Sequence, residues 1–200
     1  AAAAVACNEN AWTSCSAQCG PGVRTRAVRC SGLTGAAAGT ELLLDAGYRR
    51  IACITGPERV ETSGERLEGY RQALQARLRA EPPAGLVHHS EYTMEGGEQA
   101  MRRLLALADP PDAVFAANNK LAAGAIRVLA DAGKLPPNIG LVSFGGLPLV
   151  LLAPQGIRVT HLPARDLGLR SAQMLLERIR GLAVPPREVV LPVVIGDEES

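Results

Sequence analysis

Aromatic side chains and lysines are both scarce in this sequence, and each shortage limits what the protein can be. Phe, Trp and Tyr together make up 3% of the chain, so a core must be built from Leu, Val, Ile and Ala. Nearly all basic residues are arginines, because lysine occurs only at positions 120 and 134. The formal net charge of +1 provides no field that would draw nucleic acid or a membrane to the whole surface.

Long apolar runs are also lacking. No stretch reaches the roughly 18 apolar residues that a membrane helix requires. The apolar run Ala1–Ala6 lacks the basic segment and the long hydrophobic segment of a secretory signal. We therefore expect a cytoplasmic protein with no membrane partner.

Motifs for catalysis and for cofactor binding are absent as well. The sequence contains no G-x-S-x-G elbow and no phosphate-binding P-loop. His88 and His89 are adjacent, so on a strand they face opposite ways and cannot hold one metal ion together. His161, which precedes a Leu-Pro pair, is interpreted as a turn residue. We expect neither an enzyme nor a cofactor nor a metal ion.

The five cysteines are distributed unevenly. Only Cys53 lies beyond residue 30, and the others are Cys7, Cys15, Cys19 and Cys30. The start of the chain is also rich in Ser, Gly and Arg and has no periodic apolar pattern. We therefore divide the chain into an irregular cysteine-rich segment, residues 1–35, and a second part, residues 36–200. A zinc site made by the four early cysteines remains an alternative, although no pair has the C-x₂-C spacing.

Residues 36–200 alternate regularly between strand and helix patterns. Short apolar runs predict strands at 51–55, 86–89, 113–117, 139–144, 157–160 and 189–195. Helical spacing predicts helices at about 36–46, from Thr62 to 78, at 101–108, at 119–132 and between Pro163 and Gly181, with a Leu-rich helical turn after Phe144. Thr62 and Glu65 have the spacing of a capping box. This alternation predicts an α/β fold, in which a parallel sheet is flanked by helices on both faces.

The early segment resembles part of a known extracellular repeat. Trp12, Cys15, Cys19, Arg24 and Cys30 have the spacing found in the first strand and turn of a thrombospondin type-1 repeat. In that family stacked Trp and Arg side chains and three disulfides hold a thin extracellular domain together. The resemblance implies an extracellular interaction module through residues 12–30. A chance match and a shifted reading frame are the alternative interpretations.

A second resemblance covers the rest of the chain in order. It is carried by Gly39–Pro57, Arg66–Tyr70, Ala116–Asn119, Leu141–Phe144 and the tail Leu175–Ile179 with Val190–Pro192. These segments resemble the effector-binding domain of LacI/GalR transcription regulators, mostly its C-terminal subdomain, and periplasmic sugar-binding proteins are relatives by fold. The resemblance implies that residues 36–200 bind a small effector that controls operator binding by a repressor. A periplasmic solute-binding protein of a sugar transporter is the alternative.

The resemblance also implies where an effector binds. Arg66 matches a family arginine, and its guanidinium can grip two ligand oxygens at once; a surface ion pair with Glu65 or Glu68 is the alternative. Asn118 follows a strand, where open parallel sheets bind ligands, and it also suits a helix N-cap. Tyr92 matches an aromatic residue that lies against the ligand, or else occupies the rim. Phe144 and Gly145 complete the predicted site.

The predicted site departs from the family in its charge. Family members place an acidic residue in the loop after Phe144, where this chain has Gly145 and Gly146. Lys120 also stands where an acidic residue is common. Both changes make the site less negative, so we expect an anionic effector such as a sugar phosphate or small carboxylate in place of a neutral sugar. The alternative is that the site has lost its ligand.

The resemblance further implies parts that lie outside this sequence. A LacI/GalR regulator carries a helix-turn-helix headpiece and a first subdomain, so we expect DNA binding only through such a headpiece, in a homodimer. The helices at 36–46 and 164–180 would pack on that first subdomain. We therefore predict exposed apolar faces at Leu42–Leu44 and on the later helix, and self-association through them. The later face consists of Leu169, Ala172, Leu176 and Ile179.

Overall fold

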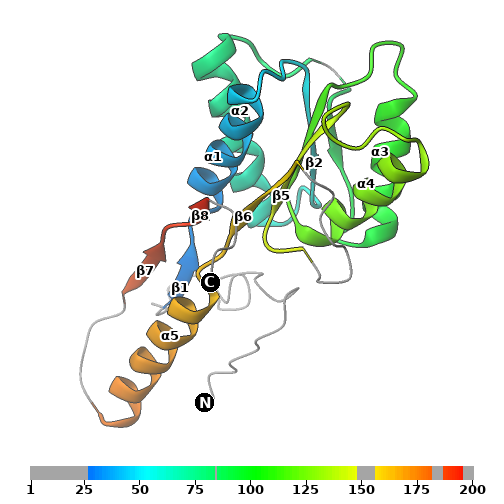
Figure 1. Ribbon diagram of the computed structural model, residues 1–200. Coiled ribbons are helices and arrows are strands. Elements are labelled where there is room, and N and C mark those ends of the chain that lie inside the picture. The colour runs from blue at the N-terminus through cyan, green and yellow to red at the C-terminus, as the bar shows by residue number, and fades with distance from the viewer. Residues whose placement is uncertain (1–26, 84, 148–155, 182–186, 196–200) are drawn as a thin grey trace.

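A six-stranded sheet with the strand order β3-β2-β4-β5-β6-β8 organises the computed structural model, which describes residues 27–83, 85–147, 156–181 and 187–195. Strands β2 to β6 run parallel, and β8 is antiparallel to β6. The strands are β2 (Ile51–Thr55), β3 (Val87–His89), β4 (Ala113–Ala116), β5 (Gly140–Phe144), β6 (Ile157–His161) and β8 (Val194–Ile195). In Figure 1, β2, β5 and β6 lie between the helices, and β8 lies at the edge of this sheet toward β1 and β7.

Two pairs of helices cover the two faces of this sheet (Figure 1). The helices are α1 (Gly32–Asp45) and α2 (Glu61–Leu78) on one face, and α3 (Met94–Leu105) and α4 (Asn119–Asp131) on the other. Alternate residues of one strand supply the two cores, because successive side chains on a strand point to opposite faces. Phe115 lies in the core below α1 and α2, whereas Val114 lies in the core below α3 and α4. The predicted parallel sheet with helices on both faces is confirmed.

Glycines allow the helices of each pair to approach closely. A Cβ atom at Gly69 of α2 would lie 2.1 Å from the carbonyl oxygen of Leu33 in α1. A Cβ atom at Gly124 of α4 would lie 2.0 Å from the carbonyl oxygen of Met94 in α3. Real Cβ atoms do not approach backbone so closely. Each helix pair therefore depends on a residue without a side chain at the crossing.

A second, smaller sheet lies beside the first. It pairs β1 (Ala27–Cys30) with β7 (Glu188–Leu191) in parallel, and α5 (Ala164–Ile179) packs on β1. Figure 1 shows these three elements extending away from the large sheet. We call β2–β6, β8 and α1–α4 the sheet lobe, and β1, β7 and α5 the projecting unit.

Regular structure begins earlier in the chain than the sequence pattern indicated. Helix α1 starts at Gly32, before the expected 36–46, because the Ser31 side chain accepts a hydrogen bond from the Thr34 N–H and caps it. Residues 27–35 are thus strand and helix, so the expectation that they are irregular is wrong. The division of the chain near residue 35 stays a prediction, and Trp12, Cys15 and Cys19 lie outside the described residues.

The predicted strand at 189–195 is two strands in different sheets. β7 pairs with β1, and β8 pairs with β6. Pro192 lies between them, and proline has no N–H group for a continuous ladder. The chain therefore crosses from the projecting unit to the sheet lobe at this point.

Two further expectations are wrong for physical reasons. Leu43 and Leu44 are each 2% exposed, because α1 packs on α2 and the large sheet instead of presenting an unpartnered face. The capping box does not form, because α2 begins one residue earlier, with Val60 as its N-cap and no side-chain cap bond. The Leu-rich helical turn expected after Phe144 falls largely at 148–155, outside the described residues.

The apolar face of α5 is exposed, as expected for a helix that would pack on a subdomain outside this sequence. Leu176 is 48% and Ile179 is 70% exposed, and of this helix only Leu167 and Met174 are buried. Among the helices in the described parts of the chain, none is long and apolar enough to cross a membrane.

Candidate functional site

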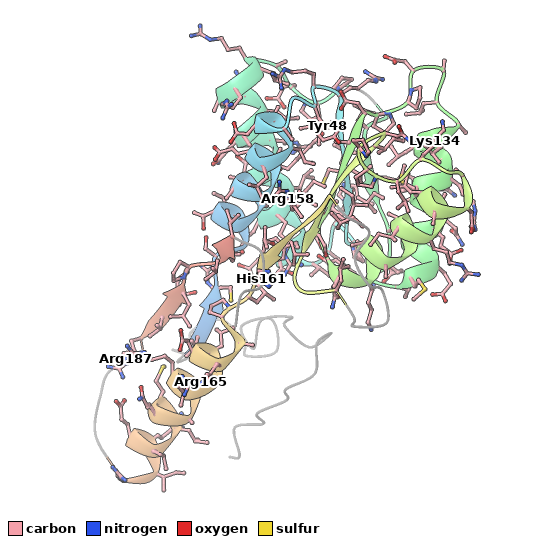
Figure 2. The ribbon with its side chains drawn as sticks, in the orientation of Figure 1. Tyr48, Lys134, Arg158, His161, Arg165 and Arg187 are labelled. Atoms are coloured by element: carbon pink, nitrogen blue, oxygen red, sulfur yellow. The ribbon has the colours of Figure 1, made fainter. Side chains whose placement is uncertain are left out.

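The candidate site lies where neighbouring parallel strands end. β2 ends at Thr55, β4 at Ala116 and β5 at Phe144, and these strands are adjacent in the large sheet. Ligands of open parallel sheets bind at this carboxyl edge. In Figure 2, His161 marks the carboxyl end of β6, and Tyr48 and Lys134 lie toward the opposite end of the sheet.

Arg66 is the centre of this edge. It lies in the second turn of α2, and its guanidinium carbon is 4.1 Å from the centre of the Phe144 ring. Its Nη1 donates a hydrogen bond of 2.6 Å to the carbonyl oxygen of Ala117. The alternative of a surface ion pair with Glu65 or Glu68 is wrong, because the Glu65 carboxylate pairs with Arg29 and Glu68 accepts from Gln72.

Burial leaves part of this guanidinium without a partner. The Arg66 Nε is buried and has no hydrogen-bond partner in the described structure. Burial lowers the pKa of Arg66, and nearby Tyr92 and Glu65 act in the opposite direction. An arginine remains protonated in proteins, so the site holds a positive charge with an unused donor. An unpaired buried donor is costly.

Tyr92 comes to this edge from the loop before α3. Its hydroxyl lies 2.8 Å from the Oγ of Ser63, in the first turn of α2. Ser63 was not predicted from the sequence as part of this edge, because its position indicated only the start of a helix. Gly56, the glycine that follows β2, was the one local sign of a close approach. A Cβ atom there would lie 2.2 Å from the Tyr92 ring and 2.4 Å from Ser63 Oγ.

Asn118 is the N-cap of α4. Its Oδ1 accepts hydrogen bonds from the backbone N–H groups of Lys120 at 2.7 Å and Leu121 at 3.3 Å. The N-cap role predicted as an alternative is therefore confirmed. Contact with a ligand stays a prediction, and the side-chain NH₂ group is the part of Asn118 that could make it.

The Phe144–Gly145 segment closes the edge from β5. Phe144 is buried and meets Phe115 edge to face, with ring centres 6.5 Å apart. Gly145 has φ +96°, its N–H donates to Thr160, and its carbonyl accepts from the Ser143 hydroxyl. A side chain at this backbone conformation is strained. At Gly146, by contrast, a Cβ atom would meet nothing within 4 Å.

Positively charged groups lie at this edge. Arg66 and the half-buried Lys120 lie near the start of α4, where the helix dipole adds partial positive charge. The carboxylates that adjoin Arg66 and Tyr92 in the sequence are paired with other arginines, Glu65 with Arg29 and Glu91 with Arg59.

Metal-binding groups do not gather in the described part of the chain, where no three His, Cys, Asp or Glu side chains come together. The two adjacent histidines have different partners: His88 Nε2 lies 3.1 Å from Arg103, and His89 Nδ1 lies 3.0 Å from the carbonyl of Gly56. Burial lowers the pKa of His88, and Arg103 adds to that effect. Of the four cysteines of the zinc alternative, Cys30 is a free thiol, and the other three lie outside the described residues.

A hollow lies at the opposite end of the sheet. It has a volume of about 480 Å³ and is lined by Pro110, Pro111, Asp112, Lys134, Asn138 and Ile139. Asp112 is engaged with the backbone, because its carboxylate accepts from the N–H groups of Arg49 and Arg50. The amino ends of parallel strands are not where such sheets bind ligands, so the Arg66 edge is the stronger candidate.

Known families match the two parts of the chain separately. Residues 40–197 match the family described as periplasmic binding protein-like domain. Residues 8–41 match the family described as thrombospondin type 1 domain. The first match covers most of the chain, and the second covers the cysteine-rich start.

Individual relatives resemble the larger part. The HTH-type transcriptional regulator CelR of Thermobifida fusca is 35% identical over 162 residues, which are 80% of this chain and 47% of that protein. The ribose operon repressor of Escherichia coli K12 is 33% identical over 86% of this chain and 52% of that protein. A solved structure of a CelR–cellobiose complex has a TM-score of 0.79 at 32% identity and covers 87% of this chain and 53% of that one. The chain thus spans about half the length of the curated relatives it matches.

Proposed function

This chain belongs to the LacI/GalR family of periplasmic-binding-protein-like effector domains, and from that premise we propose that it binds a small metabolite which controls operator binding by its parent repressor. Binding shifts such a protein between two states of different DNA affinity, since a ligand favours the state that it binds better. The DNA-reading part would lie in the portion of the relatives that this chain does not match.

One observation carries the proposal beyond family membership. The Arg66 guanidinium lies at the carboxyl edge of the sheet, 4.1 Å from the centre of the Phe144 ring, and its Nε is buried with no partner in the described parts of the chain. A buried donor of this kind is stabilised when a ligand oxygen replaces the missing partner. Asn118 and Tyr92 flank it and would add a hydrogen-bond donor and an aromatic ring.

The effector that this site fits is an anion, such as a sugar phosphate or a small carboxylate. The loop after β5 offers Gly145 and Gly146 and no carboxylate to accept hydrogen bonds from sugar hydroxyls. Arg66, Lys120 and the start of α4 contribute positive charge. A solved relative is described as a complex with cellobiose, a neutral sugar, so the proposed preference would separate this chain from that one.

The remaining parts of the proposal follow from the relatives. Those named above are transcriptional regulators or repressors, which supports a non-enzymatic regulator over a solute-binding protein of a transporter. We accordingly propose a cytoplasmic homodimer in the parent protein. The thrombospondin-like match at residues 8–41 is the observation that favours an extracellular interaction module as the second candidate.

Calorimetric titration tests the effector class. D-ribose 5-phosphate, inorganic phosphate, D-ribose and cellobiose are titrated into the 200-residue chain and its Arg66→Ala variant. We expect the phosphorylated sugar to bind more tightly than either neutral sugar. Arg66→Ala should weaken it by about 10- to 100-fold, the loss of one or two charged hydrogen bonds.

Arg71→Ala is the matched control, because Arg71 is exposed on the same helix away from this edge. It should leave the affinity unchanged. Tighter binding of the neutral sugars than of the phosphorylated one would contradict an anionic effector. Equal losses in both arginine variants would contradict a specific role for Arg66.

A further inference from the structure

The bond between Ser63 and Tyr92 joins two elements that are far apart in the sequence. The two hydroxyl oxygens are 2.8 Å apart, and Ser63 is 1% exposed. Ser63 is itself held in place, because its N–H donates to Val60 and its carbonyl accepts from the Thr55 hydroxyl. The serine is therefore a rigid partner, and Tyr92 is the residue whose position depends on the bond.

Arg66 lies one turn beyond Ser63 on α2, so the bonded pair lies next to its guanidinium. Tyr92 also interacts electrostatically with this guanidinium. Either hydroxyl can donate in the bond between Ser63 and Tyr92, and in both cases the bond occupies one hydrogen-bonding position of the Tyr92 oxygen.

Gly56 leaves the space in which this pair sits. A Cβ atom there would lie 2.2 Å from Cζ of Tyr92 and 2.4 Å from Ser63 Oγ. The end of the Tyr92 ring and the serine oxygen therefore both press against the backbone after β2. Once its hydroxyl is bonded to Ser63, the ring has little freedom to turn.

We infer that Ser63 is a positioning residue of the effector site, which fixes the Tyr92 ring beside Arg66 and commits its hydroxyl. A ligand then meets the guanidinium donors and the ring. The pair selects a ligand that combines an anionic group for Arg66 with a ring or carbon skeleton for Tyr92. This inference rests on the proposed function and refines it.

A double-mutant cycle tests the bond without any ligand. Ser63→Ala, Tyr92→Phe and the double variant are compared with the wild type by thermal unfolding. Tyr92→Phe leaves the buried serine oxygen unpaired and should lower Tm by about 2–6 °C. Ser63→Ala leaves a half-exposed phenol that water can reach, so its shift should be smaller. The double variant should lower Tm by less than the sum of the two single decreases, because neither hydroxyl is then left without its partner.

Tyr48→Phe is the matched control for the cycle. Its hydroxyl donates to the carbonyl of Pro137 at 3.0 Å, toward the other end of the sheet (Figure 2). When Tyr48→Phe is combined with Ser63→Ala, the decrease in Tm should equal the sum of the two single decreases. If the Ser63 and Tyr92 effects also add, the two residues are uncoupled and the inference is overturned.

A pair of ligands tests the positioning role. Inorganic phosphate would contact only Arg66, whereas D-ribose 5-phosphate would also place its sugar ring against Tyr92. Ser63→Ala should weaken D-ribose 5-phosphate by about 3- to 10-fold, the order expected for one misplaced contact, and leave phosphate unchanged. Equal weakening of both would show a merely structural role for Ser63. If the wild type binds neither, the anionic effector fails, while the unfolding cycle still decides the Ser63–Tyr92 coupling.

Discussion

The sheet lobe and the projecting unit contain helices of similar length, yet their apolar residues have different environments. In the sheet lobe, Leu121 and Leu129 of α4 are fully buried between α3 and the sheet. In the projecting unit, Leu176 and Ile179 of α5 are exposed at helical spacing. The comparison teaches that an apolar stripe predicts a helix, whereas its burial depends on whether a second layer lies against it.

The largest expected effect comes from adding one methyl group to a glycine in each region. Gly124→Ala would place a Cβ atom 2.0 Å from the Met94 carbonyl, whereas Gly168→Ala in α5 meets nothing within 4 Å. We expect Gly124→Ala to cost about 3 kcal/mol through forced separation of α3 and α4. Gly168→Ala should stabilise by about 0.5 kcal/mol through helix propensity. Urea unfolding measures both, and equal effects would remove the contrast between the regions.

The second prediction concerns the open face of α5. We expect the chain to self-associate through it, so Leu176→Glu with Ile179→Glu should raise the concentration needed for association about tenfold or more. Gln173→Glu on the same helix adds charge without removing apolar surface and is the control. Light scattering across a dilution series makes the measurement. A monodisperse wild-type monomer would show that exposure of this face does not drive association.

The smallest expected effect is a pH dependence confined to the sheet lobe. Burial and Arg103 lower the pKa of His88, so the unfolded chain takes up its proton at higher pH than the folded chain does. The stability from neutral His88 is present above the ordinary pKa of 6.5 and is lost as the pH falls below it. His88→Gln should therefore reduce the drop in Tm between pH 7.5 and pH 5.5. An unchanged drop would mean that His88 does not contribute to it.

Much of the sheet lobe could be predicted because its signals are local. Apolar runs bounded by Gly and Pro predicted the ends of β2 and β6 to within one residue. The family resemblance pointed to Arg66, Asn118 and Phe144, and these residues lie at one edge of the sheet in the structure. Ligand contact at these residues stays a prediction. The helix cap at Asn118 was predictable for the same local reason, since an Asn preceding a helix caps its own first turn.

The features that could not be predicted depend on distant contacts. The split of residues 189–195 required knowing that β7 pairs with β1, at the other end of the chain. The burial of Leu43 and Leu44 required knowing that α1 packs on α2. In each case the local pattern was compatible with two environments, and the element packed or paired against the segment determined which one it has.

By itself, the sequence determined the order of strands and helices, the family, and the position of Arg66 at the carboxyl edge of the sheet. These follow from periodicity and motifs that lie within a few residues of one another. Only the tertiary structure decided that Arg66 Nε is buried with no partner among the described residues, and that Ser63 bonds to Tyr92, 29 positions away. The physical reason is that hydrogen bonds and burial depend on which surfaces meet, and that is settled only when the chain has folded.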